Sequence, residues 1–197
     1  ERSYPIVIGK GLLADAASHV LSVTKPSHVA VVTQPPIAHH WAEPVVESFR
    51  ARDLLVTLIV VPDGETAKSF EQLGHIIDTM LANRLPRQAC LVALGGGVVG
   101  DLGGFAAAVF LRGVDFVQIP TSLLAMVDAS VGGKTGINTP RGKNLVGAFW
   151  QPRLVLADLD ALTTQPEREL HAGMAEVIKH GVIADAALFE ALERDEA

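Results

Sequence analysis

Residues 89–101 read ACLVALGGGVVGD, an apolar run that ends in three consecutive glycines. The run from Ala89 to Leu94 has the length and composition of one buried strand. The glycines satisfy the pattern G-x-G-x-x-G and lead into a second apolar segment, so backbone N–H groups at the start of a helix could hold a pyrophosphate there. The stretch therefore predicts a strand, a turn and a helix, the repeating unit of an α/β fold.

The chain on either side repeats this alternation of short apolar runs and helical patterns. Strands are predicted at Tyr4–Ile8, His28–Thr33, Leu54–Val61 and Phe116–Ile119, and helices at Leu12–Val23, Ile37–Arg52 and Ser69–Arg84, the last with a capping pair of Ser69 and Gln72. Strands that are apolar throughout and separated by helices predict a parallel sheet covered on both faces. We predict a Rossmann-like α/β domain over residues 1–160.

Beyond residue 160 the pattern is helical only. Helices are predicted at Arg168–Ile183 and Ala186–Arg194, the first capped by Thr164 with Glu167 and the second by Asp185. The chain opens without Met and ends inside a helical pattern. We therefore predict that residues 161–197 begin an all-α domain, cut short, and that the chain is a piece of a longer protein.

Composition narrows the class of protein. The 197 residues carry a net charge of −6, so no basic face for nucleic acid is indicated. No apolar run reaches the roughly 18–20 residues that span a bilayer, and no signal peptide is visible. The single cysteine, Cys90, lies in an apolar run and suits a buried, inert thiol in a reducing compartment. We expect a cytoplasmic protein that binds neither nucleic acid nor membrane.

The glycine-rich turn by itself leaves two interpretations open. It follows the fourth predicted strand instead of the first, and no acidic residue closes a strand about 20 residues further on, as a ribose contact requires. Gly100, Gly103 and Gly104 could equally serve close packing of a helix on the sheet. The residues alone thus indicate a nucleotide site, tight helix packing, or both.

A second glycine-rich segment runs from Pro120 to Pro152. Its charged and amide residues, Asp128, Lys134, Lys143 and Asn144, are interspersed with five glycines. An exposed hairpin with solvated lysines is one interpretation. Because the glycines and charges recur throughout the segment, a ligand site is favoured, with lysines as point charges for phosphate or carboxylate.

Several motifs resemble the 3-dehydroquinate synthase family. Its signature segment is matched by VDASVGGKTGIN (127–138) and GKNLVGAFWQP (142–152). Three further motifs stand in the family's order along the chain: DGETAK (63–68) and GGGVVGD (95–101) before that segment, and AGMAEVIKHG (172–181) after it. The resemblance implies a homodimeric enzyme of the shikimate pathway that uses NAD and Zn²⁺ or Co²⁺. Its reaction converts a sugar phosphate, 3-deoxy-D-arabino-heptulosonate 7-phosphate, into 3-dehydroquinate and phosphate.

The resemblance also implies roles for individual residues. NAD contacts fall on Asp63, Glu65, Lys68, Gly97, Val98, Val99, Gly100, Asp101, Thr121, Ser122, Lys134, Lys143 and Thr164. Substrate and catalytic contacts fall on Lys134, Lys179, Asp128, Asn144 and Arg112, the last across a dimer contact. Thr66 and Ala67 stand where the family usually has Gln-Tyr, so no contact is carried over to these two side chains.

One metal ligand is implied, Glu176, and the family's other two are histidines of a C-terminal domain that this chain does not contain. His180 is one helical turn from Glu176 but is not a ligand in the family, and His39 and His40 are interpreted as structural or solvated. A catalytic zinc site takes three protein ligands, so we expect this chain alone to be inactive.

Two other functions remain open. A related sugar-phosphate cyclase or a metal-dependent alcohol dehydrogenase would share the fold and cofactors, although the intact VGGKTGIN and GKN motifs disfavour both. The second is a non-catalytic dinucleotide-binding module.

Overall fold

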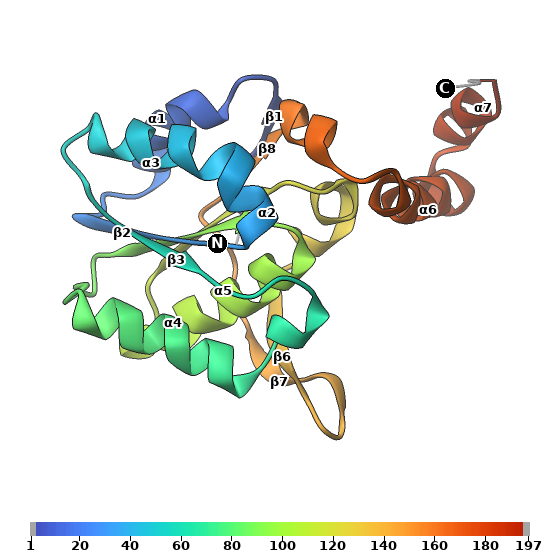
Figure 1. Cartoon of the computed structure of the whole chain (residues 1–197). Helices are drawn as coiled ribbons and strands as arrows, with labels where there is room; N and C mark the ends of the chain where they lie inside the picture. The colour runs from blue at the N-terminus through green and yellow to red at the C-terminus, as the bar shows by residue number, and fades with distance from the viewer. Residues whose placement is uncertain (1–2, 195–197) are drawn as a thin grey trace.

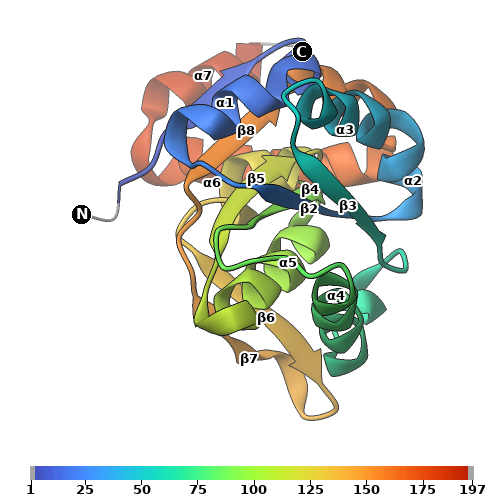
Figure 2. The ribbon, with the colours of Figure 1, turned by 90° about the vertical axis from the view of Figure 1, so that its left-hand side faces the viewer.

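A computed structural model describes residues 3–194 as a six-stranded parallel sheet with helices on both faces (Figures 1 and 2). The strands are β1 (Ile6–Gly9), β2 (His28–Thr33), β3 (Leu55–Val60), β4 (Cys90–Gly95), β5 (Asp115–Pro120) and β8 (Leu154–Asp158). Their order in the sheet is β1-β8-β5-β4-β2-β3, and every neighbouring pair is parallel. The predicted Rossmann-like α/β fold is confirmed.

The helices divide between the two faces of the sheet, as Figure 2 shows. On one face lie α1 (Ala16–Val23) and α3 (Glu43–Arg50), the latter continuing a short α2 (Pro35–Ile37) through a single π turn. On the other lie α4 (Phe70–Ala82) and α5 (Gly97–Val109). Ser69 caps α4 as predicted, because its hydroxyl accepts a bond of 3.2 Å from the backbone N–H of Gln72.

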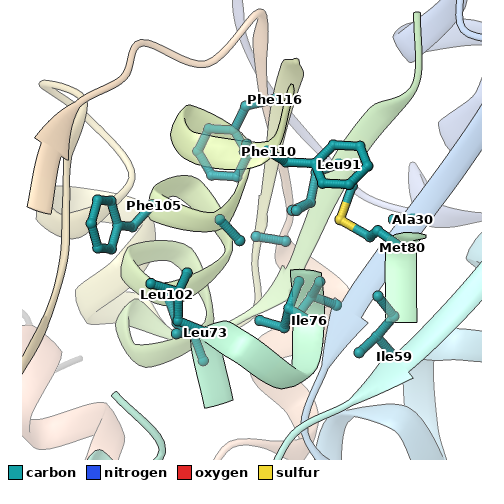
Figure 3. Close-up of a cluster of buried hydrophobic side chains, with 14 of the residues drawn as sticks. Ala30, Ile59, Leu73, Ile76, Met80, Leu91, Leu102, Phe105, Phe110 and Phe116 are labelled. Carbon is teal, nitrogen blue, oxygen red and sulfur yellow. The ribbon is translucent and has the colours of Figure 1, made fainter. Parts of the chain in front are cut away.

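Each face has its own hydrophobic core. Figure 3 shows the core under α4 and α5, in which Ile76 and Met80 from α4 and Leu102 from α5 meet Leu91 of β4 and Phe116 of β5. The opposite core packs α1 and α3 against the other sides of the same central strands and includes Cys90, as predicted. Burial raises the pKa of the Cys90 thiol, which keeps it protonated and unreactive.

The outer strands depart from the expected full burial. Every residue of the central strands β2, β4 and β8 is buried, whereas Ile8 of β1 is 66% exposed and Leu55 of β3 is 65% exposed. Both are edge strands, so their outward side chains have no covering helix or neighbouring strand on one side.

The glycine-rich segment after β5 forms a hairpin of β6 (Lys134–Thr139) and β7 (Gly142–Phe149), which extends from the domain in Figure 1. Ile137 is buried, and Val146 and Ala148 pack against the core under α5. A side chain at Gly147 would overlap the carbonyl oxygen of Thr135 on the facing strand, so only glycine fits there. The hairpin interpretation of the backbone is therefore correct.

Residues after β8 form α6 (Glu167–Ala184) and α7 (Ala186–Arg194), which lie to one side of the sheet in Figure 1. Asp185 caps α7 as predicted, accepting from the backbone N–H of Leu188. The predicted cap at Thr164 is wrong: Pro166 occupies the N-cap position of α6 without a side-chain hydrogen bond, because Gln165 and Pro166 are still extended. Residues 195–197 of the predicted second domain lie outside the described residues. Within residues 3–194, every helix is too short or too polar to cross a membrane.

Candidate functional site

A cleft of about 580 Å³ opens between α5, the loop after β5 and the hairpin. Two of its residues, Asp101 and Asp128, come from the segments that follow β4 and β5, and open α/β sheets bind ligands at the carboxyl ends of their strands. Its polar lining consists of Asp101, Asp128, Lys134, Thr135 and Asn144, and its apolar lining includes Val131, Leu145 and Phe149. Four predicted site residues (Asp101, Asp128, Lys134 and Asn144) thus line one cleft.

A buried lysine joins two of these groups. Lys68, only 4% exposed, donates from Nζ to Asp101 Oδ2 at 2.6 Å and to Asn144 Oδ1 at 2.5 Å. Burial raises the pKa of the Asp101 carboxyl, and the Lys68 ammonium opposes that rise through its hydrogen bond and its charge. The cluster links the loop after β3, the N-terminal half of α5 and the hairpin.

A second polar group extends the cluster outward. Glu65 Oε1 lies 3.8 Å from Lys68 Nζ and 3.9 Å from Lys143 Nζ, and it accepts a hydrogen bond of 2.8 Å from Asn138 Nδ2. Asn138 was given no role from the sequence, because an uncharged amide inside the motif VGGKTGIN carries no separate signal. The structure nevertheless brings Glu65, Lys68, Lys143 and Asn144 into one polar cluster.

The glycine-rich turn allows α5 to pack closely and begins that helix near the strand ends. A Cβ at Gly100 would lie 2.6 Å from Gln118 Oε1, and one at Gly104 would overlap Thr135, so these glycines permit close packing of α5. Gly96 is the N-cap of α5, with Gly97 the first helical residue, and a Cβ at Gly96 would lie 3.4 Å from Ser122 Oγ. The helix therefore begins on glycines that pack against the loop after β5, close to the strand ends.

Unpartnered polar atoms mark the same strand ends. Thr33 at the end of β2 and Thr121 just after β5 are buried, and their hydroxyls have no hydrogen-bond partner among the described residues. A buried hydroxyl without a partner is costly unless a ligand or water satisfies it. Together with the N-terminus of α5, these atoms fit a bound dinucleotide.

Helix α6 carries Glu176, the predicted metal ligand, and Lys179, a predicted substrate contact. The Lys179 ammonium pairs with Glu176 Oε2 one turn away, and this hydrogen bond, assisted by the charges of Glu176 and Asp128, raises the pKa of Lys179. The helix is held near the cleft because Gly173 packs directly on Leu123, whose backbone N–H also donates to Gln165 Oε1 at 3.0 Å.

The metal ligands are incomplete in this part of the protein. Across residues 3–194, no group of three His, Cys, Asp or Glu side chains converges as a metal site would require. His180 is exposed, and its Nδ1 contacts the backbone carbonyl of Glu176. His39 and His40 are exposed on the surface, with their rings in contact. Glu176 thus fits a metal only as one ligand among others from elsewhere.

Some predicted residues do not reach the cleft in this chain. Arg112 is exposed, precedes β5 and does not line the cleft. Asp63 is exposed and accepts from the backbone N–H of Gly64. Thr164 donates to the carbonyl of Ala161 and accepts from Trp41 Nε1. Val99 is buried in the core, so only its backbone is available to a ligand, and half-buried Val98 does not line the cleft.

The fold and the cleft define a Rossmann-like α/β domain with a polar site at the carboxyl ends of its strands, joined to a helical segment. The chain belongs to the 3-dehydroquinate synthase family: the family profile described as "3-dehydroquinate synthase N-terminal" matches residues 58–172.

Individual relatives agree with this assignment. The chain is 56% identical over 194 residues to 3-dehydroquinate synthase of Caulobacter vibrioides, covering 98% of this chain and 52% of that protein. The chain therefore spans about half the length of the curated relatives it matches.

Solved structures with the same fold come from related enzymes. ValA, a 2-epi-5-epi-valiolone synthase from Streptomyces hygroscopicus with NAD⁺ and Zn²⁺ bound, is 34% identical with a TM-score of 0.87, over 98% of this chain and 53% of that one. A 2-deoxy-scyllo-inosose synthase complexed with carbaglucose-6-phosphate, NAD⁺ and Co²⁺ is 27% identical with a TM-score of 0.85, over 93% of this chain and 50% of that one.

Proposed function

We propose that the whole protein converts 3-deoxy-D-arabino-heptulosonate 7-phosphate into 3-dehydroquinate and phosphate, and that this chain supplies its NAD-binding half. The observation that carries the proposal is the buried contact of Lys68 with Asp101 and Asn144, which joins the cofactor-side loops to the substrate-side hairpin at one cleft. The 3-dehydroquinate synthase relatives, more than half identical over nearly the whole chain, support the choice of reaction.

NAD⁺ and a divalent metal are part of this proposal. The related synthase structures were solved with NAD⁺ and Zn²⁺ or Co²⁺, and the open start of α5 with the unpartnered hydroxyl of Thr121 suits a dinucleotide. When bound, NAD⁺ accepts and returns a hydride, and the metal polarises the hydroxyl that loses it. Glu176 would hold the metal together with ligands from the rest of the protein.

The chain's own residues bind and orient the substrate. Asp128 and Asn144 line the cleft and can hold sugar hydroxyls, while Lys134 supplies positive charge for a phosphate or a carboxylate. Lys179, kept protonated by Glu176, supplies a second cation beside Asp128. No protein base is needed for the elimination, because the departing phosphate can itself take the proton.

A homodimer in the cytoplasm completes the proposal. Arg112 is exposed and does not line the cleft of its own chain, so a contact with the substrate phosphate would come from Arg112 of the partner subunit. The buried, unpaired Cys90 suits a reducing compartment.

A different sugar-phosphate cyclase is the second candidate, because the ValA structure shares the fold at 34% identity. Incubating the full-length protein with the heptulosonate phosphate, NAD⁺ and Zn²⁺ decides between them. We expect stoichiometric release of 3-dehydroquinate and phosphate, and failure to form 3-dehydroquinate would refute the proposal.

The metal assignment has its own test in the full-length enzyme. Glu176→Ala should abolish zinc-dependent turnover, because it removes a ligand. His180→Ala, on the same helix and exposed, is the matched control and should retain turnover. Full activity of the Glu176 variant would refute the ligand assignment.

A further inference from the structure

Asn138 connects three of the residues assigned to the site, although nothing above gives it a role of its own. Its backbone N–H donates to the carbonyl of Lys68 at 2.8 Å, and its side-chain Nδ2 donates to Glu65 Oε1 at 2.8 Å. Its Oδ1 accepts from the backbone N–H of Asn144 at 3.0 Å. Both ends of one amide are thus used, one toward the cofactor side and one toward the substrate side.

A β-bulge makes these contacts possible. The ladder between β6 and β7 pairs Ile137 with Val146 and Thr139 with Gly142, so that Asn138 alone on β6 faces Lys143, Asn144 and Leu145 on β7. The extra residues of a bulge are left out of the ladder, and the Asn138 side chain accepts a hydrogen bond from the freed N–H of Asn144. The other groups of Asn138 bond to the loop after β3, which carries Glu65 and Lys68.

The contact with Asn144 acts on a constrained backbone. Asn144 has φ +54°, in the left-handed region that side chains other than glycine seldom adopt. Asn138 holds its N–H, and Lys68 holds its side-chain oxygen at 2.5 Å. These two contacts orient the Asn144 amide toward the cleft instead of leaving it to rotate on a hairpin.

The contact with Glu65 fixes a carboxylate that has only longer ion pairs. Lys68 and Lys143 stand 3.8 and 3.9 Å from Glu65 Oε1, whereas the Asn138 amide stands 2.8 Å from the same oxygen. Lys143 is 76% exposed, so its pull on Glu65 is weakened by water. Asn138 is the contact that decides where this carboxylate points.

We propose that Asn138 is a positioning residue, whose single side-chain amide fixes the position of the cofactor-side Glu65 relative to the substrate-side Asn144. The inference rests on the proposed function, because it assigns Asn138 to the same site. It touches neither substrate nor cofactor in this role; it acts through the two residues that it holds.

An exchange of donor and acceptor tests this directly. In the full-length enzyme, Asn138→Asp sets two carboxylates against each other, since the new side chain cannot donate to Glu65. Adding Glu65→Gln restores a donor and an acceptor in the reverse sense, while the aspartate still accepts from the N–H of Asn144. Asn138→Ala removes both contacts without adding charge.

We expect Asn138→Ala to lower kcat by on the order of tenfold to a hundredfold, the cost of a small misplacement of reacting groups. Asn138→Asp should be worse in both kcat and the Kd for NAD⁺. The kcat and the Kd for NAD⁺ of the double variant should return to within about threefold of those of Glu65→Gln alone, as a direct pairwise contact requires. A merely structural role would shift the melting temperature without this rescue.

The results separate the two proposals. Wild-type kinetics in Asn138→Ala, or a double variant no better than Asn138→Asp, would overturn the role of Asn138 while leaving the reaction intact. If the wild-type enzyme fails to turn over the heptulosonate phosphate, the proposed reaction falls. The same cycle measured as NAD⁺ affinity by calorimetry then decides the role of Asn138, and absence of rescue there would overturn it.

Discussion

Replacing Lys68 by Met removes the cation on which the cleft's polar cluster depends. The side chain is 4% exposed, and its ammonium contacts Asp101 Oδ2 at 2.6 Å and Asn144 Oδ1 at 2.5 Å. Methionine fills nearly the same volume but cannot donate. Asp101 is then left as a largely buried carboxylate without its counter-charge.

The size of the effect follows from the burial of the pair. Removing one partner of a buried ion pair costs about 3–5 kcal/mol. The Asp101 side chain is 22% exposed, which favours the lower end, about 3 kcal/mol. For a chain of 150–250 residues each kcal/mol shifts the melting temperature by about 2–4 °C, so we expect a loss of about 6–12 °C.

The loss should depend on pH in a defined direction. Burial already raises the pKa of Asp101 in the folded protein, and removing Lys68 raises it further. An acid whose pKa is higher folded than unfolded binds its proton more tightly when folded, so stability falls as pH rises through the interval between the two pKa values. The difference between variant and wild type is therefore largest at high pH and shrinks as acidification protonates Asp101.

Thermal unfolding followed by circular dichroism between about pH 5 and about pH 8 measures both effects. Lys143→Met is the matched control, because that lysine is 76% exposed and 3.9 Å from Glu65; exposed pairs contribute about 0–1 kcal/mol. Adding Asp101→Asn to Lys68→Met should recover part of the loss. A Lys68 variant no less stable than the Lys143 control, or a difference that grows on acidification, would refute the reasoning.

Two further predictions concern close packing and a buried carboxylate, both read from urea unfolding. Gly104→Ala should lower the free energy of unfolding by about 1–3 kcal/mol, because its methyl would overlap Thr135 and lie 3.0 Å from a Phe116 ring carbon. Gly74→Ala on α4, with nothing within 4 Å, should leave that free energy unchanged or raise it by about 0.5–1 kcal/mol. Equal effects of the two variants would contradict the packing argument. Asp158→Ala should lower the free energy of unfolding by about 3 kcal/mol, because this carboxylate is 1% exposed and accepts hydrogen bonds from three backbone N–H groups at 3.0–3.1 Å. A loss below about 1 kcal/mol would contradict that role.

Local pattern was sufficient for most of the sheet and for two of the three predicted helix caps. The apolar runs placed five of the six parallel strands, all but β8, within about two residues, because a strand buried on both faces needs a continuous apolar sequence. The cap at Thr164 failed, since the following Gln165–Pro166 pair stays extended and postpones the helix.

The hairpin was the element that pattern described least well. Its strands carry many glycines and lysines, so neither alternation nor β-branched content marked them. Its shape depends on contacts across the hairpin and with α5, such as Gly147 facing Thr135, which no local window contains. For the same reason the link of Asn138 to Glu65, 73 residues away, was invisible.

The sequence by itself determined the α/β class, the family and the residue types available for chemistry, because these follow from periodicity and motifs that are local in the chain. Only the tertiary structure decided which of those residues meet. It buried Lys68 between Asp101 and Asn144, and it left Arg112 exposed and outside the cleft lining. The physical reason is that burial, charge pairing and pKa depend on distances between segments far apart in sequence, which are set by the packing of the whole sheet.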